Sequence, residues 1–168
     1  VYQAAWNPFS IKPVVKLAHH WNRASGPIQV SAFSNCPSVR LSLNGVQQGA
    51  VQTPNSWQSD TSRNLTQTTT LIPFQSTWTV NWAAGTLQAD CLDSFGSVLA
   101  SDKLVTAGAA AKIVLSVVPN VVRPDGAAFA VTANGSDAAF VTAQVQDANG
   151  NLVPTANQNV TFSVSGPA

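Results

Sequence analysis

The acidic residues are the first candidates for chemistry, because acid–base hydrolysis of a sugar linkage needs two carboxyl groups roughly 5–10 Å apart. All seven are aspartates, and the chain contains no glutamate. They are Asp60, Asp90, Asp93, Asp102, Asp125, Asp137 and Asp147. Three of them, at positions 93, 125 and 147, lie close to glycines in predicted turns, where aspartate commonly forms the turn itself. The sequence therefore predicts turn-forming aspartates and no catalytic carboxylate pair.

The only two histidines are adjacent. Neighbouring residues of a strand point to opposite faces, so His19 and His20 are not expected to bind one metal ion together. A Ser-His-Asp triad is not favoured either, because the chain lacks a Gly-x-Ser-x-Gly elbow. His19 shares a predicted strand face with Leu17 and Trp21, which favours a core or interface position. The sequence thus predicts no metal site, no cofactor and no catalytic residue.

The two cysteines, Cys36 and Cys91, lie far apart in the chain. Cys91 alternates with Leu87 and Ala89 and is expected to be buried, whereas Cys36 precedes a proline at the end of a predicted strand. A disulfide between them is possible, but two free thiols are the expectation that the sequence favours.

Five tryptophans in 168 residues raise the possibility of sugar stacking. Trp78 and Trp82 flank Val80 on one predicted strand face, and Trp21 belongs to an apolar stripe, so core packing is the expectation for these three. Trp57 differs, because it lies in a polar loop between Ser56 and Gln58. It is the aromatic residue expected to be partly exposed, and the candidate for contact with a carbohydrate or a neighbouring domain.

The composition excludes several classes of protein. The chain is 45% hydrophobic but only 9% charged, against about 25% in an average soluble domain. Its formal charge of +1 has no run of either sign, which argues against a nucleic-acid partner or an acidic membrane surface. No apolar run approaches the ~20 residues of a membrane span. Methionine is absent, so we expect a piece of a longer parent, and the abundance of Ser, Thr, Asn and Gln favours an extracytoplasmic one, periplasmic or secreted.

The elements that would position these residues are β-strands. Apolar and polar residues alternate in short runs, and Asn44-Gly45 is a strong hairpin turn. Residues 53–68 form a long polar loop. The expected strands cover residues 15–21, 28–32, 39–43, 46–51, 69–74, 78–82, 87–91 and 98–105. Seven or eight short strands in about 95 residues predict an antiparallel, immunoglobulin-like β-sandwich over residues 12–107.

Small, uncharged residues from Thr106 to Ala110 mark the expected domain boundary. The strand pattern restarts at residues 113–117, 129–131, 140–145 and 160–164, which gives a second immunoglobulin-like domain over residues 108–168 with too few strands to be complete. Truncation is favoured over completion by a partner, because an open sheet edge invites aggregation. Residues 1–11 carry apolar positions at helical spacing and are expected to be a strap or the remnant of a preceding helix.

Several strings together resemble a known arrangement. Lys12-Pro13-Val14-Val15 leads to His20-Trp21-Asn22. Then follow Ser34-Asn35-Cys36, the run Val39 to Gly45, Gly85 to Ala89, and Thr106-Ala107-Gly108. The order resembles the segment after the catalytic barrel in bacterial β-galactosidases of glycoside hydrolase family 2. Residues 139–142, 147–154 and 160–166 are similar to the immunoglobulin-like domain that follows it in those enzymes.

The resemblance implies that the chemistry lies elsewhere in the parent, because both catalytic residues of that family are glutamates on the upstream barrel. The chain has no glutamate, so neither can be carried over to it. Residues 1–11 would then be the last trace of the barrel, and the barrel would be the main partner. Pro37-Ser38 departs from the acidic residues expected after the cysteine, and the loop at 53–68 is long and polar; these departures concern the substrate rather than the architecture.

The leading hypothesis is a non-catalytic accessory fragment of a β-galactosidase-like hydrolase that supports the barrel, subunit contacts or the rim of the sugar cleft. The alternative is a carbohydrate-binding or adhesive immunoglobulin-like module of an exported bacterial protein, suggested by Trp57 and the polar surface. A repeat unit of a surface protein is less favoured, because the two halves do not repeat each other.

Overall fold

The computed structural model describes residues 3–4, 8–55, 72–118 and 140–165. The chain divides into two compact units, Val1–Thr106 and Ala107–Ala168, and the division falls within the small, uncharged stretch from Thr106 to Ala110. Each unit is described by itself below. Of the N-terminal segment, Gln3 and Ala4 are helical, and Ala4 is buried.

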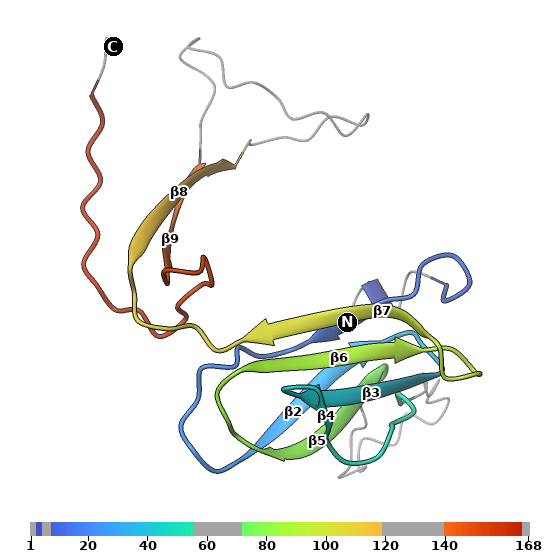
Figure 1. The fold of residues 1–168 in the computed structure, drawn as a ribbon. Helices are drawn as coiled ribbons and strands as arrows, with labels where there is room; N and C mark the ends of the chain where they lie inside the picture. The colour runs from blue at the N-terminus through green and yellow to red at the C-terminus, as the bar shows by residue number, and fades with distance from the viewer. Residues whose placement is uncertain (1–2, 5–7, 56–71, 119–139, 166–168) are drawn as a thin grey trace, which may run out of the picture. The chain divides into compact units, whose positions relative to one another are not determined.

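The first unit consists of two antiparallel sheets (Figure 1). One has the order β1-β2-β5 and the other β4-β3-β6-β7. The strands are β1 (Val15–Leu17), β2 (Pro27–Ser34), β3 (Ser38–Leu43), β4 (Val46–Gln47), β5 (Gln75–Asn81), β6 (Thr86–Leu92) and β7 (Val98–Val105). These orders match the A-B-E and C′-C-F-G sheets of an immunoglobulin-type sandwich. The all-β, immunoglobulin-like fold class is thus confirmed.

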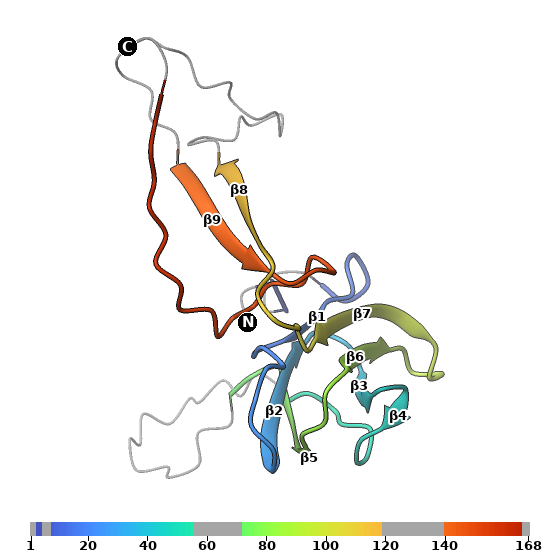
Figure 2. The same cartoon turned by 60° about the vertical axis from the view of Figure 1, so that its left-hand side comes forward.

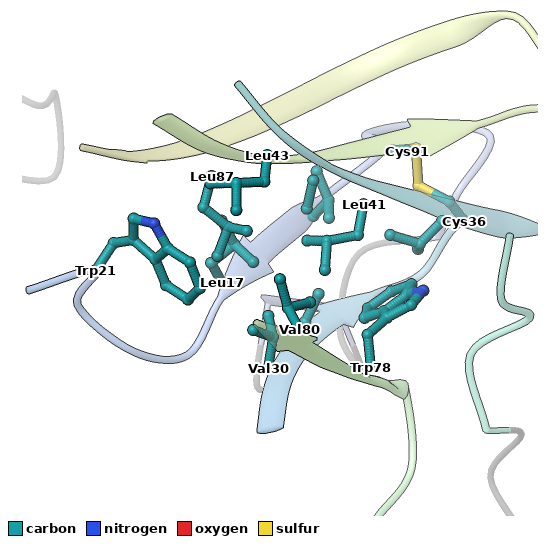
Figure 3. Close-up of a cluster of buried hydrophobic side chains, with 14 residues drawn as sticks. Leu17, Trp21, Val30, Cys36, Leu41, Leu43, Trp78, Val80, Leu87 and Cys91 are labelled. Atoms are coloured by element: carbon teal, nitrogen blue, oxygen red, sulfur yellow. A yellow bond between two sulfur atoms is a disulfide. The ribbon is translucent and has the colours of Figure 1, made fainter. Parts of the chain in front are cut away.

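The core lies between the two sheets (Figure 3). Because side chains alternate along a strand, every second residue points inward. Strand β5 illustrates this, with Trp78 and Val80 buried and the residues on either side of each exposed. The facing layer comes from β3 and β6, which pair Leu41 with Ala89 and Leu43 with Leu87. All six of these apolar side chains are buried, so one packed interior holds the sandwich together.

The strand expected over residues 15–21 is shorter than predicted. Strand β1 ends at Leu17, where its pairing with β2 ends, and His19 and His20 are exposed. The prediction that His19 lies in the core is therefore wrong, and its alternative, an interface position, stays a prediction. Trp21 is buried, but from a loop that folds over the end of the sandwich rather than from a strand. The apolar alternation in the sequence continues to Trp21, but the strand pairing between β1 and β2 ends at Leu17.

Two other predicted strands also differ from the structure. The strand returning from the Asn44-Gly45 turn keeps only Val46 and Gln47 in β4, and Gln52 then forms an isolated bridge with Val39. Of the strand expected over residues 69–74, the described part, residues 72–74, lies outside any strand, and Phe74 has a positive φ of 62°. A left-handed residue interrupts the extended conformation there.

The second unit contains two described strands, β8 (Lys112–Val118) and β9 (Phe140–Gln146), which form an antiparallel hairpin-like sheet (Figure 2). The cross-strand pairs Ile113–Val145, Leu115–Ala143 and Val117–Val141 place six apolar residues on one face. Much of that face is exposed, since Leu115 and Val117 have exposed fractions of 61% and 58%. The strand expected at 129–131 lies outside the described residues.

Residues 160–164 do not form the predicted strand. They have the required alternation of Val160, Phe162 and Val164, yet no regular pairing is present and all three side chains are exposed. The chain leaves β9 after Leu152 bridges to Gln146 and the amide of Val153 donates to the carbonyl of Val145. An alternating segment becomes a strand only where a partner edge accepts its hydrogen bonds. Among the described residues, no helix is long and apolar enough to cross a membrane.

Two buried serines of the sandwich give opposite predictions. Within the described structure the hydroxyl of Ser76 is buried without a hydrogen-bond partner. The Ser34 hydroxyl donates to the carbonyl of Val14 at 2.8 Å and accepts from the amide of Cys36 at 3.1 Å. We expect Ser76→Ala to leave the free energy of unfolding unchanged or raise it by about 1 kcal/mol, and Ser34→Ala to lower it by about 1–3 kcal/mol. Urea denaturation of both variants tests this; equal losses would contradict it.

Candidate functional site

The described carboxylates were the main candidates for chemistry, and each is engaged by protein donors. Asp90, Asp93, Asp102 and Asp147 fall within the described ranges, whereas Asp60, Asp125 and Asp137 lie outside them. The four come from different places in the fold: two strands and two turns. Their partners decide whether any of them is available for catalysis.

Asp90 lies on β6 with an exposed fraction of only 3%. Arg40 on the neighbouring strand β3 approaches it at 2.8 Å, and the side chains of Gln88 and Ser101 donate to its other oxygen at 2.6 and 2.7 Å. Burial raises the pKa of Asp90, but the hydrogen bonds from Gln88, Arg40 and Ser101 outweigh it, so the net pKa lies below the ordinary value. A carboxylate held ionised by three donors is a structural anchor and a poor proton donor.

Asp102 connects the two sheets at their edge. It lies on β7, and its two oxygens accept from the Lys16 ammonium at 2.6 Å and from the Leu17 amide at 2.8 Å. The Leu17 amide belongs to the end of β1, in the other sheet. The carboxylate thus replaces a neighbouring strand as acceptor for that amide, which is a structural use.

Asp147 organises the turn that follows β9. It has an exposed fraction of 2% and accepts from the amides of Gly108, Asn149 and Asn151 and from the Asn151 side chain. The side-chain hydrogen bond from Asn151 and the backbone bond from Gly108 are the largest influences, and together the donors lower the pKa of Asp147 to about 2. Asp93 makes a smaller version of the same motif with the amides of Phe95 and Ser97. Both aspartates are turn formers, as predicted.

The histidines and cysteines offer no described metal site. No group of three potential metal-ligating side chains occurs among the residues that the structure describes. Cys36 and Cys91 are joined in a disulfide, with their Cα atoms 5.6 Å apart. The free thiols that the sequence favoured are therefore wrong, and the structure has the alternative, a disulfide.

The described tryptophans are structural. Trp21 and Trp78 are buried, and their ring nitrogens donate to the carbonyls of Ala83 and Ala50. Trp82 is half-buried against the core and donates to the carbonyl of Trp21 at 3.2 Å. Each of the three therefore packs its ring and satisfies its N–H inside the protein. Trp57, the predicted carbohydrate contact, lies outside the described residues.

The residues that sequence reasoning missed are two asparagines that act as clamps. The Asn35 side chain accepts from the amide of Val14 at 2.8 Å and donates to the carbonyl of Lys12 at 2.9 Å. Its backbone amide also donates to the carbonyl of Val14. One residue thus fixes the segment that leads into β1. The string Ser34-Asn35-Cys36 contributes to the family resemblance, but the sequence alone offers no structural reason for Asn35.

Asn44 makes the second clamp, at the turn between β3 and β4. Its φ of 51° fits the tight turn with Gly45, and its side chain accepts from the Thr86 amide at 2.8 Å and donates to the Ala84 carbonyl at 3.0 Å. A Cβ atom at Gly85 would collide with this side chain, which explains the glycine. The Asn44-Gly45 and Gly85-Thr86 strings are therefore two halves of one contact.

The Asn35 clamp predicts a specific loss of stability. In Asn35→Ala the amide of Val14 and the carbonyl of Lys12 lose their partners, so we expect the free energy of unfolding to fall by about 1–3 kcal/mol. Asn81→Ala, at an exposed position at the end of β5, is the matched control and should change it by less than about 0.5 kcal/mol. Chemical denaturation of both variants measures the difference. If the two variants unfold at the same denaturant concentration, Asn35 is not a clamp.

Asp147 predicts a pH dependence. Its folded-state pKa of about 2 lies below the ordinary value of 3.8, so its stabilising effect is complete above pH 4 and is lost as the pH falls towards 2. We expect the amides of Gly108, Asn149 and Asn151 to be protected from exchange above pH 4 and to lose that protection towards pH 2. In Asp147→Asn their protection should be low and should not follow this titration. Amide exchange measured by NMR across this range tests the prediction; an identical pH profile in both proteins would refute it.

Two family profiles match the chain. Residues 125–168 match the glycoside hydrolase family 2 C-terminal domain 5, and residues 25–100 match a domain of unknown function. The first match lies within the second unit and the other within the sandwich.

Full-length proteins align with nearly the whole chain. The chain is 32% identical to a β-galactosidase of Bacteroides ovatus over 168 residues, which cover 99% of the chain and 16% of that protein. It is 28% identical to a β-glucuronidase of Formosa agariphila, covering 99% of the chain and 14% of that protein. The chain thus spans about one sixth of the length of the curated relatives that it matches.

Solved structures also match nearly the whole chain. A β-glycosidase from Bacteroides vulgatus superposes with a TM-score of 0.70 at 25% identity, covering 99% of this chain and 18% of that one. A β-glucuronidase of glycoside hydrolase family 2 superposes with a TM-score of 0.73 at 25% identity, covering 98% and 15%. Over nearly its whole length, the chain is therefore similar to the C-terminal region of glycoside hydrolase family 2 enzymes.

Proposed function

We propose that the chain is a non-catalytic accessory part of a β-glycoside hydrolase, which supports the parent's catalytic barrel or shapes the rim of its sugar cleft. The observation that carries the proposal is the alignment of 99% of the chain with 14–16% of two such enzymes. A segment of this size, whose first unit is a β-sandwich with its own core, fits a supporting element of a much larger protein.

The chemistry of the chain supports a non-catalytic role. Acid–base cleavage of a glycoside needs one carboxyl group that can give up a proton and a second that can act as base or nucleophile. The four described aspartates are each held by two or more donors, and the pKa of both Asp90 and Asp147 is lowered. The family resemblance places catalysis on two glutamates, and the chain has none.

The substrate of the parent is proposed only as a class. The two curated relatives are named as a β-galactosidase and a β-glucuronidase, so the shared feature is a β-linked glycoside. We favour a β-galactoside, because the relative with the higher identity carries that name. Because the family resemblance places both catalytic residues on the barrel, selectivity between the two would be set there.

A carbohydrate-binding module receives less support from the described residues. Sugar binding by stacking uses an exposed aromatic ring beside polar groups; the described tryptophans bury theirs wholly or in part, and the strongly exposed aromatic residues described are the phenylalanines Phe95, Phe140 and Phe162, which have no polar handle. Trp57, on which that alternative depended, is not among the described residues. The accessory role is therefore the function we favour.

The accessory role predicts an inactive chain. The purified 168-residue protein should hydrolyse chromogenic β-galactosides and β-glucuronides no faster than buffer, because the chain has no glutamate and the described aspartates are all held by protein donors. The parent enzyme, with its barrel, is the positive control under the same conditions. Turnover that stays with the chain through purification and falls in Asp90→Asn would overturn the proposal. Saturable quenching of tryptophan fluorescence by the same sugars would instead favour the binding module.

A further inference from the structure

The disulfide between Cys36 and Cys91 is the feature that the accessory role leaves unexplained. These are the only cysteines of the chain, and both are almost completely buried, with exposed fractions of 4% and 0%. Their Cα separation of 5.6 Å is typical of a disulfide. No third thiol exists in the chain to exchange with them.

The bond ties the connection between the two sheets to β6. Cys36 lies in the connection between β2 and β3, which belong to different sheets, and Cys91 lies on β6 beside β3 (Figure 3). The cross-link therefore fixes the crossover from one sheet to the other against β6.

The same bond lies next to the Asn35 clamp. The Cys36 amide donates to the hydroxyl of Ser34, which donates in turn to the carbonyl of Val14. Asn35, between Ser34 and Cys36, holds Val14 and Lys12 with its side chain. Fixing Cys36 thus fixes the turn that holds the chain leading into β1.

We propose that the chain completes its fold by oxidation, and that its parent protein works in an oxidising compartment outside the cytoplasm. In this step the thiols of Cys36 and Cys91 lose two protons and two electrons and form the S–S bond. A thiol–disulfide oxidoreductase of that compartment takes them up, and its disulfide becomes a dithiol. Disulfides of this kind persist in periplasmic and secreted proteins and are kept reduced in the cytosol.

The surroundings assign the bond a structural role. Exchange requires a thiolate to reach one of the two sulfur atoms, and burial of both residues blocks that approach in the folded protein. Regulatory disulfides are exposed or poised next to a resolving cysteine, and neither condition holds here. Reduction is therefore expected to follow unfolding instead of triggering it.

The first experiment counts thiols in the 168-residue chain produced in an oxidising compartment. The protein is denatured without reductant and treated with a thiol-specific maleimide, and its mass is measured. We expect no label without reductant and two labels per chain after reduction. Two labels in the unreduced protein would overturn the proposal, and this result does not depend on any variant folding.

The second experiment compares the wild type with the double variant Cys36→Ala/Cys91→Ala, in which alanine leaves no unsatisfied thiol. A long closed loop should stabilise the oxidised wild type, so prior reduction of the unfolded chain should lower its Tm by about 10 °C or more. The same reduction should leave the Tm of the double variant unchanged, which controls for effects of the reductant itself. A wild type that melts at the same temperature before and after reduction would contradict the inference. Catalysis in the parent is not measured, so failure here leaves the accessory role intact.

Discussion

The sandwich depends on satisfying backbone amides and carbonyls where its short strands begin and end. Strand β1 has only three residues and strand β4 two, so most of their polar groups cannot be paired by a long ladder. Side chains supply the missing partners: Asn35 for the segment before β1, Asp102 for the Leu17 amide, and Asn44 for the turn at Thr86. Short side chains suit this purpose, because their polar atoms stay close to the backbone.

This constraint gives a physical meaning to the unusual composition. A chain with 9% charged residues and aspartate as its only acid is poor in long ionic side chains. The described aspartates are used as acceptors for backbone amides or for one buried ion pair, and the clamping asparagines do the same work without charge. Groups committed in this way cannot exchange protons with a substrate, so the features that stabilise the fold also support its accessory role.

The sequence predicted well what local periodicity controls and poorly what depends on pairing. The inward positions of Trp78, Val80 and Leu87 follow from alternation, and the structure confirms them. His19 was misplaced because the same alternation continued beyond Leu17, where pairing with β2 had already ended. Asn35 was not recognised as a clamp, since its partners lie more than twenty residues away and a string of letters does not reveal its hydrogen bonds.

In the second unit, apolar alternation does not lead to burial. Residues 160–164 and the paired face of β8 and β9 have the same apolar alternation as the buried strands of the first unit, yet they are exposed. Alternation specifies which side chains should be covered, and it carries no information on which polypeptide covers them. In the first unit the two sheets cover each other, and a disulfide ties the crossover between them to β6. In the described part of the second unit one sheet has no facing layer, so its apolar residues gain little of the hydrophobic stabilisation that their pattern makes available.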